Sequence, residues 1–220
     1  MTFERIMALI GIALIAFLIG SFSPAIVISN SVAKRDIRKY GSGNAGSTNM
    51  ARTFGIKFGV LTFLGDVLKG AFVAYLSTVA SSLLGEEGIK YAVIAGSIFV
   101  VVGHNWPVYY SFKGGKGVAT TLGVLMVHMP IPTLICLALT ATVMLLSHTV
   151  SLGSLAGVIF TVIASFIACP ENVELHVISI TLAGLVWLLH IPNIKRLIKG
   201  SERKFDLKKK LKKNSDEKTE

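Results

Sequence analysis

The chain has 220 residues, of which 52% are hydrophobic and only 15% are charged, and its formal net charge is +10. Soluble domains carry about 25% charged residues, so this composition, with a mean hydropathy of +0.67, argues against a soluble globular protein and predicts an integral membrane protein. Eight of the 22 Lys and Arg residues follow Glu202. This basic stretch has no aromatic residue after Phe205 and no recognisable nucleic-acid-binding module, so it indicates an anionic membrane leaflet rather than nucleic acid.

Apolar runs separated by polar connectors predict an all-α fold with about seven transmembrane spans. In chain order the candidate spans are 6–29, 55–83, 90–104, 117–128, 131–147, 152–169 and 176–195. The third and fourth are short, so the alternative is a five-span fold in which both are re-entrant. The first run is too long for a signal peptide and lacks a small-residue cleavage site, so we expect it to remain as a span.

Charge predicts the orientation of these spans, because cytoplasmic loops carry an excess of Lys and Arg. Five basic residues lie between the first and second spans and Lys57 follows at the start of the second, whereas the loops predicted on the other side hold only Arg5 and Lys90. We therefore predict an external N-terminus and a cytoplasmic C-terminus. Residues 1–202 are expected to form one transmembrane catalytic domain, and residues 203–220 a basic cytoplasmic tail.

The first polar segment on the predicted cytoplasmic side runs from Gly41 to Arg52 and contains three glycines. Successive backbone N–H groups in such a loop can form an anion-binding nest, and an arginine can hold a phosphate through two parallel hydrogen bonds. The alternative is a flexible polar connector, and the Gly-Lys-Ser/Thr ending of a P-loop is missing. Its candidate site residues are Gly41, Ser42, Gly43, Asn44, Asn49 and Arg52.

The second polar segment, residues 103–120, places two lysines around two glycines just before an apolar helix. The free N–H groups of a helix N-terminus favour anions, so we expect phosphate binding here rather than lysines that only anchor the chain at the membrane surface. His104 can carry a proton or make a structural hydrogen bond to the backbone. The candidate site residues are His104, Lys113, Gly114, Gly115, Lys116 and Thr120.

The third polar segment begins at the end of the last predicted span. His190, Asn193 and Arg196 recur at intervals of three, which places them on one face of a helix. Pro192 fits the first turn of that helix, and Glu202 follows shortly after. The alternative is an interfacial helix end with basic anchors.

Ionisable residues elsewhere are few. Asp66 and Lys69 lie three residues apart inside the second span, where we expect a self-neutralising structural pair. Near the polar segments the only carboxylates are Asp36 and Glu202, so no metal site and no cofactor is expected. No histidine is followed five positions later by an aspartate, which argues against glycerolipid acyltransferases that use a His-x4-Asp pair.

Taken together, the three segments resemble the signature motifs of one family, the acyl-phosphate:glycerol-3-phosphate acyltransferases. The residues that carry the resemblance are Gly41-Ser-Gly-Asn-x-Gly-Ser-Thr-Asn-x-x-Arg52, Gly103-His-x-x-Pro, Phe112-Lys-Gly-Gly-Lys-Gly-x-Ala-Thr120 and His190-x-x-Asn-x-x-Arg-Leu with Gly200-x-Glu202. The resemblance covers almost the whole chain. Ser47 departs from it, because alanine is common there, and the Lys-rich tail resembles an appendage.

The resemblance implies an enzyme of the bacterial cell membrane with its active site on the cytoplasmic face. It would transfer an acyl group from acyl phosphate, not acyl-CoA or acyl carrier protein, to the sn-1 hydroxyl of glycerol 3-phosphate. The products would be lysophosphatidic acid and phosphate, for phospholipid synthesis. The acyl chain would lie in a groove open to membrane lipid. Each motif set is complete within one chain, so a monomer is the default expectation.

Two mechanisms are compatible with these residues. In the first, the glycerol hydroxyl attacks the acyl carbonyl directly, and Ser42, Asn49 and Asn193 orient the substrates or an oxyanion. His190, or secondly His104, would take the proton, unless a substrate phosphate takes it. In the second, less favoured mechanism, Ser42 forms an acyl-enzyme.

Two other classes of protein share some of these features, namely a small anion transporter and a non-catalytic membrane scaffold with a lipid-binding tail. A transporter would hold its polar residues near the bilayer midplane. Here they gather at one edge of the predicted spans, which favours an interfacial enzyme.

Overall fold

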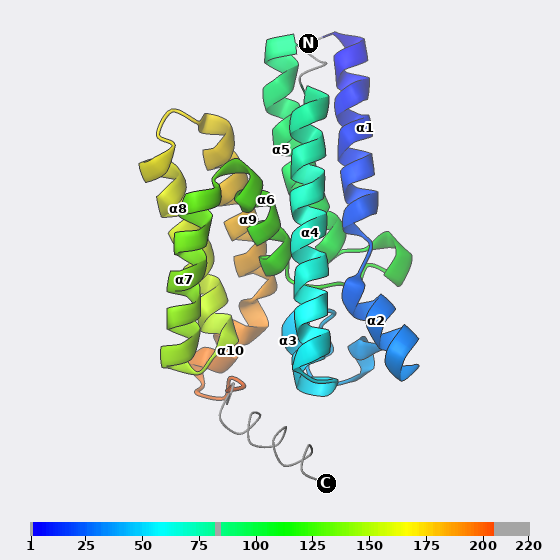
Figure 1. Cartoon of the computed structure of the whole chain (residues 1–220), viewed down its shortest axis with the longest axis vertical. Coiled ribbons are helices and arrows are strands. Elements are labelled where there is room, and N and C mark those ends of the chain that lie inside the picture. Colours follow the sequence, from blue (N-terminus) through cyan, green and yellow to red (C-terminus); the bar gives the residue numbers. More distant parts are fainter. Residues whose placement is uncertain (1, 82–84, 205–220) are drawn as a thin grey trace.

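The computed structural model describes residues 2–81 and 85–204, with the side chains of residues 81–89 excepted, and this part of the chain is helical (Figure 1). The tail beyond Lys204, on which the prediction of a separate basic segment rests, lies outside the described residues. The helices are α1 (Phe3–Gly20), α2 (Pro24–Ala33), α3 (Ser47–Thr53), α4 (Ile56–Ser81), α5 (Gly85–Asn105), α6 (Val118–His128), α7 (Pro130–Ser147), α8 (Val150–Ala168), α9 (Val173–Leu189) and α10 (Ile191–Ile198), with 3-10 turns at η1 (Ile37–Lys39) and η3 (Val108–Tyr110).

The all-helical fold is confirmed, but the count of seven spans is not. Among the described residues, five segments are long and apolar enough to cross a membrane, and α9 with α10, bent by 60°, makes a possible sixth. The run 90–104 is not short, because it belongs to a 21-residue candidate span. By contrast α6 has 11 residues, or about 16 Å at 1.5 Å per residue, against a hydrocarbon core of about 30 Å.

The helices form two groups joined by α6. Helices α1, α4 and α5 pack together on one side, and α7, α8 and α9 on the other (Figure 1). Helix α6 packs against α4, and α9 contacts α5. The main buried core lies where the groups meet and consists of Ala16, Val73, Ala74, Val100, Val101, Val124, Leu125, Met129, Leu175, Ile178 and Leu182.

Glycines set the close approach of these helices. A Cβ atom at Gly70 of α4 would strike the carbonyl oxygen of Thr120 in α6, and one at Gly123 of α6 would strike that of Val67 in α4. Lipid chains are as apolar as the helices, so helices in a membrane associate largely by such tight packing of small residues. This contact holds α6, whose first turn belongs to the second polar segment, against α4.

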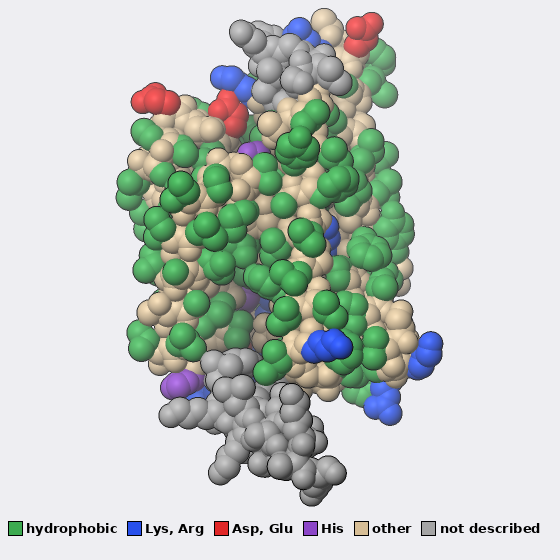
Figure 2. Space-filling model, viewed as in Figure 1, with side chains coloured by type: hydrophobic (Ala, Val, Ile, Leu, Met, Phe, Trp, Pro, Cys, Tyr) green, Lys and Arg blue, Asp and Glu red, His purple; other side chains and the backbone are tan. Residues whose placement is uncertain are grey.

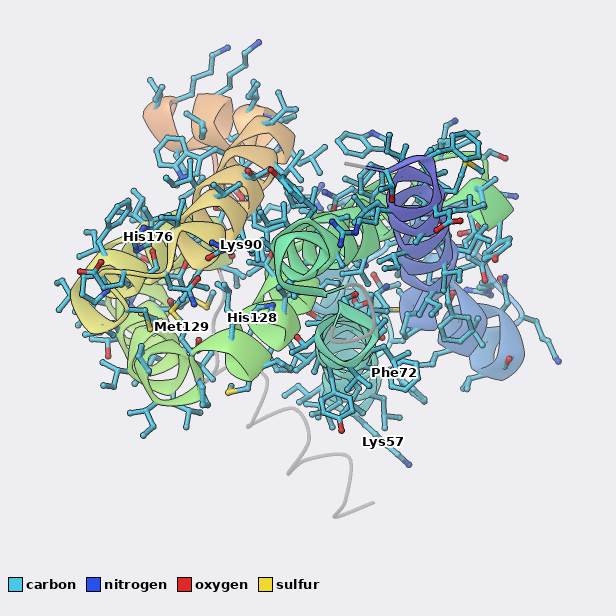
Figure 3. The ribbon with its side chains drawn as sticks, turned by 90° about the horizontal axis from the view of Figure 1, so that it is seen from above. Lys57, Phe72, Lys90, His128, Met129 and His176 are labelled. Atoms are coloured by element: carbon cyan, nitrogen blue, oxygen red, sulfur yellow. The ribbon has the colours of Figure 1, made fainter. Side chains whose placement is uncertain are left out.

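The outer surface is apolar over a broad belt (Figure 2). Phe72 of α4, for example, is 55% exposed and points away from the neighbouring helices (Figure 3). In Figure 2 the acidic side chains that are visible lie at the upper end, together with some Lys and Arg side chains, whereas the visible Lys, Arg, Asp and Glu side chains at the lower end are basic. The two ends of the bundle therefore differ in charge.

Candidate active site

The three polar segments, distant in sequence, meet at the lower end of the bundle. The Ala45 N–H donates to the Gly114 carbonyl at 3.4 Å, which joins the first segment to the second. The Lys116 ammonium donates to Oδ1 of Asn193 and joins the second to the third. Nη2 of Arg203, which directly follows the third segment, donates to the Gly41 carbonyl at 3.2 Å and so joins the third segment to the first.

Asn49 shapes the loop of the first segment. Its side-chain amide donates to the carbonyls of Tyr40 and Asn44, each at 3.0 Å, and its Oδ1 accepts the Ser42 N–H at 2.9 Å. Gly41 has φ +59°, and a Cβ atom there would strike this same Oδ1. The turn therefore needs glycine at this position. Asn49 is buried and acts as an anchor of the loop rather than as a surface that faces a ligand.

Ser42 lies on the exposed side of this loop. Within the described part of the chain, no histidine, lysine or carboxylate contacts its hydroxyl group. A serine nucleophile needs an adjacent base to activate it, so the arrangement favours a hydrogen-bonding role for Ser42. Gly43, with φ +73°, and Asn44 complete the loop beside it.

The second segment folds back onto the end of α5. The Gly114 N–H donates to the Asn105 carbonyl at 3.2 Å, and the Gly115 N–H to the His104 carbonyl at 3.1 Å. The half-buried Lys116 follows, directed toward the third segment. Lys113 is exposed on the other side of the glycines, whereas Thr120 is fully buried against α4.

Burial lowers the pKa of Lys116 to about 8, and the neighbouring Arg196 guanidinium adds to the effect. Because the ammonium stands close to other cations, a bound anion would relieve repulsion and favour its charged form. Among the described residues no carboxylate forms an ion pair with Lys116, so its charge is available to an anion.

Glu202 organises the third segment. Its Oε1 accepts hydrogen bonds from Asn193 Nδ2 at 2.8 Å and from Ser151 Oγ at 3.0 Å, and its Oε2 accepts from Arg196 Nε at 2.7 Å. Burial alone would raise the pKa of Glu202, but these hydrogen bonds outweigh burial and hold the pKa below its usual range. Glu202 therefore stays ionised and fixes the directions of the Asn193 amide and the Arg196 guanidinium.

His190 lies at the end of α9, and 4% of its surface is exposed. Its Nδ1 is 2.8 Å from the Val186 carbonyl oxygen. A carbonyl oxygen can only accept, so Nδ1 must carry the hydrogen, and the neutral ring then has its lone pair on Nε2. This tautomer provides a nitrogen that can accept a proton.

Arg52 completes the cluster, its Nη2 donating to the Arg203 carbonyl at 3.2 Å. Burial lowers the pKa of Arg52, and the next largest cause is the adjacent Arg203. Four cationic side chains, Arg52, Lys116, Arg196 and Arg203, therefore gather around one carboxylate, Glu202. We call this group the cation cluster. The surplus of positive charge suits it to bind anions such as phosphates.

His104 does not join the cation cluster. It lies beneath the second segment, where its Nδ1 is 2.9 Å from Lys69 Nζ and 3.1 Å from Asp66 Oδ1. The predicted pair of Asp66 and Lys69 is confirmed, with a separation of 2.8 Å. The sequence did not suggest that His104 would belong to it.

Two residues of the site were missed by sequence reasoning. Ser151 is the second residue of α8, and no feature of the sequence around it signals a bond to Glu202. Arg203 was assigned to the basic tail, where it is one of many cations. Its contacts with Gly41 and Arg52 depend on the return of the chain after α10.

Comparison with known proteins shows which family has a similar sequence. A family model described as glycerol-3-phosphate acyltransferase matches residues 10–200. The chain is 42% identical to the glycerol-3-phosphate acyltransferase of Clostridioides difficile (strain 630) over 205 residues, which cover 93% of this chain and 99% of that protein. It is 40% identical to that of Neisseria meningitidis serogroup A / serotype 4A (strain DSM 15465 / Z2491) over 196 residues, 89% and 96% of the two chains.

A solved structure also has this fold. The crystal structure of PlsY (YgiH), an integral membrane glycerol 3-phosphate acyltransferase, in its glycerol 3-phosphate form, is similar with a TM-score of 0.79. The sequence identity is 33%, over 90% of this chain and 96% of that chain.

Proposed function

The chain belongs to the glycerol-3-phosphate acyltransferase family, and on that premise we propose that it transfers an acyl group from acyl phosphate to the sn-1 hydroxyl of glycerol 3-phosphate. The products are 1-acyl-glycerol 3-phosphate (lysophosphatidic acid) and inorganic phosphate. It acts in phospholipid synthesis as an integral protein of a bacterial membrane.

The observation that carries this proposal is the cation cluster. Both substrates bear a phosphate group, so the site must hold two anions close together. Arg52, Lys116 and Arg196 come from three separate segments, and the cluster holds a single carboxylate. The N–H groups and turns of Gly41, Gly43, Gly114 and Gly115 let the backbone approach a phosphate closely. No cofactor is required, because acyl phosphate is already activated.

Direct transfer is the mechanism that these residues support. The glycerol hydroxyl oxygen bonds to the acyl carbon, while the bond from that carbon to the phosphate oxygen breaks and phosphate leaves with the electron pair. Ser42 and Asn193 supply hydrogen bonds that orient the substrates. The positive charges of the cluster stabilise the charge that develops on the leaving phosphate.

We assign the proton of the attacking hydroxyl to Nε2 of His190, because the bond from Nδ1 to Val186 leaves that nitrogen free to accept. If this is right, His190→Ala lowers kcat by about 100- to 10,000-fold, the usual cost of losing a general base. If a substrate phosphate takes the proton instead, the variant regains appreciable turnover at high substrate concentration, and His190 only positions the hydroxyl.

The lower end of the bundle, with the cation cluster, is proposed to face the cytoplasm. The excess of Lys and Arg in its loops supports this orientation. Ser201→Cys places an exposed thiol at this end. We expect a membrane-impermeant maleimide to leave it unlabelled in intact cells and to label it after permeabilisation. Labelling in intact cells would reverse the orientation.

The deciding experiment uses the purified protein in detergent, with acyl phosphate and glycerol 3-phosphate. Phosphate release that requires both substrates, together with formation of lysophosphatidic acid, supports the enzyme. An anion transporter would give no such release, and its activity would need a sealed compartment. Labelled acyl phosphate offered without glycerol 3-phosphate tests for an acyl-enzyme, and a trapped acyl-Ser42 would overturn direct transfer. Chromatography with light scattering checks the expected monomer.

A further inference from the structure

Three ionisable side chains lie buried together between α4 and α5. Asp66, Lys69 and His104 are 2%, 8% and 5% exposed. Lys69 Nζ is 2.8 Å from Asp66 Oδ1 and 2.9 Å from His104 Nδ1, and Asp66 Oδ1 is 3.1 Å from the same Nδ1. We call these three residues the buried triad. Ionisable groups are costly at membrane depth, so their presence calls for a function.

Lys69 makes one further bond, which ties the triad to a third element. Its ammonium donates to the carbonyl oxygen of Phe22 at 2.8 Å, at the break between α1 and α2. The chain is interrupted there, so that carbonyl lacks the partner that a continuous helix would supply. The triad thus joins α4, the last turn of α5 and the α1–α2 break.

The imidazole of this triad is the floor of the second polar segment. A Cβ atom at Gly115 would strike Nε2 of His104, and one at Gly114 would strike the His104 carbonyl oxygen. The same carbonyl accepts the Gly115 N–H at 3.1 Å. The glycine turn therefore rests directly on His104, and its shape depends on where that ring is held.

Lys116 is the next residue along the chain, and its ammonium reaches Asn193. A continuous path of contacts therefore runs from Asp66 and Lys69, through the His104 ring and Gly115, to the cation cluster. Gly115 covers Nε2 of the ring, and Nδ1 contacts Lys69 and Asp66, so neither nitrogen is offered to substrate.

We propose that Asp66, Lys69 and His104 are positioning residues for acyl transfer: they fix the ring that supports Gly114 and Gly115 and so hold the Lys116 ammonium where a substrate phosphate binds. The inference rests on the proposed function for the identity of that phosphate. It replaces the role of proton carrier for His104 with one of support.

The first test removes both charges of the pair at once, in Asp66→Asn/Lys69→Met, because a single substitution would leave an unpaired charge buried. We expect KM for glycerol 3-phosphate to rise about tenfold or more, with a smaller change in kcat. This pattern is the one expected when an enzyme loses a contact that binds the substrate before the reaction. Displacement of a contact by about 1 Å can cost about 100-fold.

Amide hydrogen exchange provides a readout that does not depend on activity. In the double variant we expect faster exchange at Gly114 and Gly115, whose N–H groups bond to the end of α5, and unchanged exchange in α7 and α8. If the triad only stabilises the bundle as a whole, exchange rises everywhere and the melting temperature falls, while KM stays constant. That outcome, or unchanged exchange and KM in a folded variant, overturns the proposal.

The matched control is Ser97→Ala. Ser97 is a fully buried polar residue of α5, and its Oγ is 3.0 Å from Nε2 of His128 at the end of α6. This pair joins α5 to α6, far from the cation cluster. The control should alter neither KM nor exchange at Gly114 and Gly115. An equal effect of control and double variant would show that any buried polar contact suffices and would refute the proposal.

A second test uses shape rather than charge. Gly115→Ala should raise KM about tenfold, because its methyl group meets the imidazole. In a His104→Ala background the same methyl group has room, so Gly115→Ala should add little. Additive effects of the two substitutions would show that the ring is not the floor of the turn. If the unmodified protein releases no phosphate at all, the proposed function fails, while the exchange experiment still tests the support of the turn.

Discussion

The cation cluster and the buried triad are both built from charged side chains, but they balance their charges in opposite ways. In the cluster, Arg52, Lys116, Arg196 and Arg203 surround only Glu202, and the group opens at the end of the bundle. In the triad, Asp66 neutralises Lys69, His104 contacts both, and all three side chains are buried away from solvent. Surplus charge in an accessible place indicates a binding site, whereas balanced charge in a closed place indicates support.

The largest loss of activity is expected for Lys116→Met, with Lys113→Met as its matched control. Loss of the Lys116 charge should lower kcat/KM about 100- to 1000-fold, the cost of removing a preorganised contact to developing charge. Lys113 is exposed, and no bond from its side chain to the cation cluster is found among the described residues, so its loss should cost less than about tenfold. Steady-state phosphate release measures both. Equal losses would mean that the cluster has been assigned the wrong lysine.

Glu202→Gln tests the one carboxylate of the cluster. Gln keeps the shape but loses the charge-assisted bond to Arg196 and part of the bond to Asn193. We expect kcat/KM to fall about 10- to 100-fold, because hydrogen bonds to a charged group contribute about 1.5–3 kcal/mol. Ser151→Ala removes only one neutral donor to the same carboxylate and should cost at most about tenfold. If Ser151→Ala costs more than Glu202→Gln, the carboxylate is not the organising group.

The pH dependence of KM tests whether the Lys116 ammonium binds a substrate phosphate. Its pKa is about 8, lowered first by burial and then by Arg196. Below that pH the ammonium is charged and holds phosphate, and above it the charge is lost. KM for the substrate bound by Lys116 should therefore rise about tenfold per pH unit well above pH 8. Lys116→Arg, which stays protonated, should flatten the profile. A wild-type KM that is constant from pH 7 to 9.5 contradicts the assignment.

The smallest effect is expected at the opposite end of the bundle. There Lys90 and Glu174 form an ion pair of 3.2 Å beside a hollow of about 290 Å³ that His128 also lines (Figure 3). The Lys90 side chain is 66% exposed, and such pairs contribute at most about 1 kcal/mol. Lys90→Ala should leave KM and kcat unchanged. A loss of activity would show that polar residues at this end also serve the reaction.

Several features of the site could be predicted because they are local in sequence. The glycine-rich first segment was expected to form a loop, and its Gly41 and Gly43 adopt positive φ. His190, Asn193 and Arg196 were expected to meet the other segments, and Asn193 and Arg196 join the second segment and Glu202. The pairing of Asp66 with Lys69 follows from a spacing of three on a helix.

Other features could not be predicted, because they depend on contacts between distant segments. Asn49 was a candidate for substrate binding, but its amide holds the first loop. The sequence marked the run 117–128 as short, but only the structure shows that its 11-residue helix packs against α4 at Gly70 and Gly123.

The sequence by itself determined that this is a helical membrane protein, and it singled out the three polar segments that we propose bind phosphate. Composition, charge and glycine spacing are properties of short stretches of sequence, so they can be recognised without a structure. Only the tertiary structure decided that His104 supports the glycine turn, that Glu202 orients Asn193 and Arg196, and that Arg203 returns to Gly41. Those relations depend on how closely whole helices pack, and short windows of sequence do not contain that information.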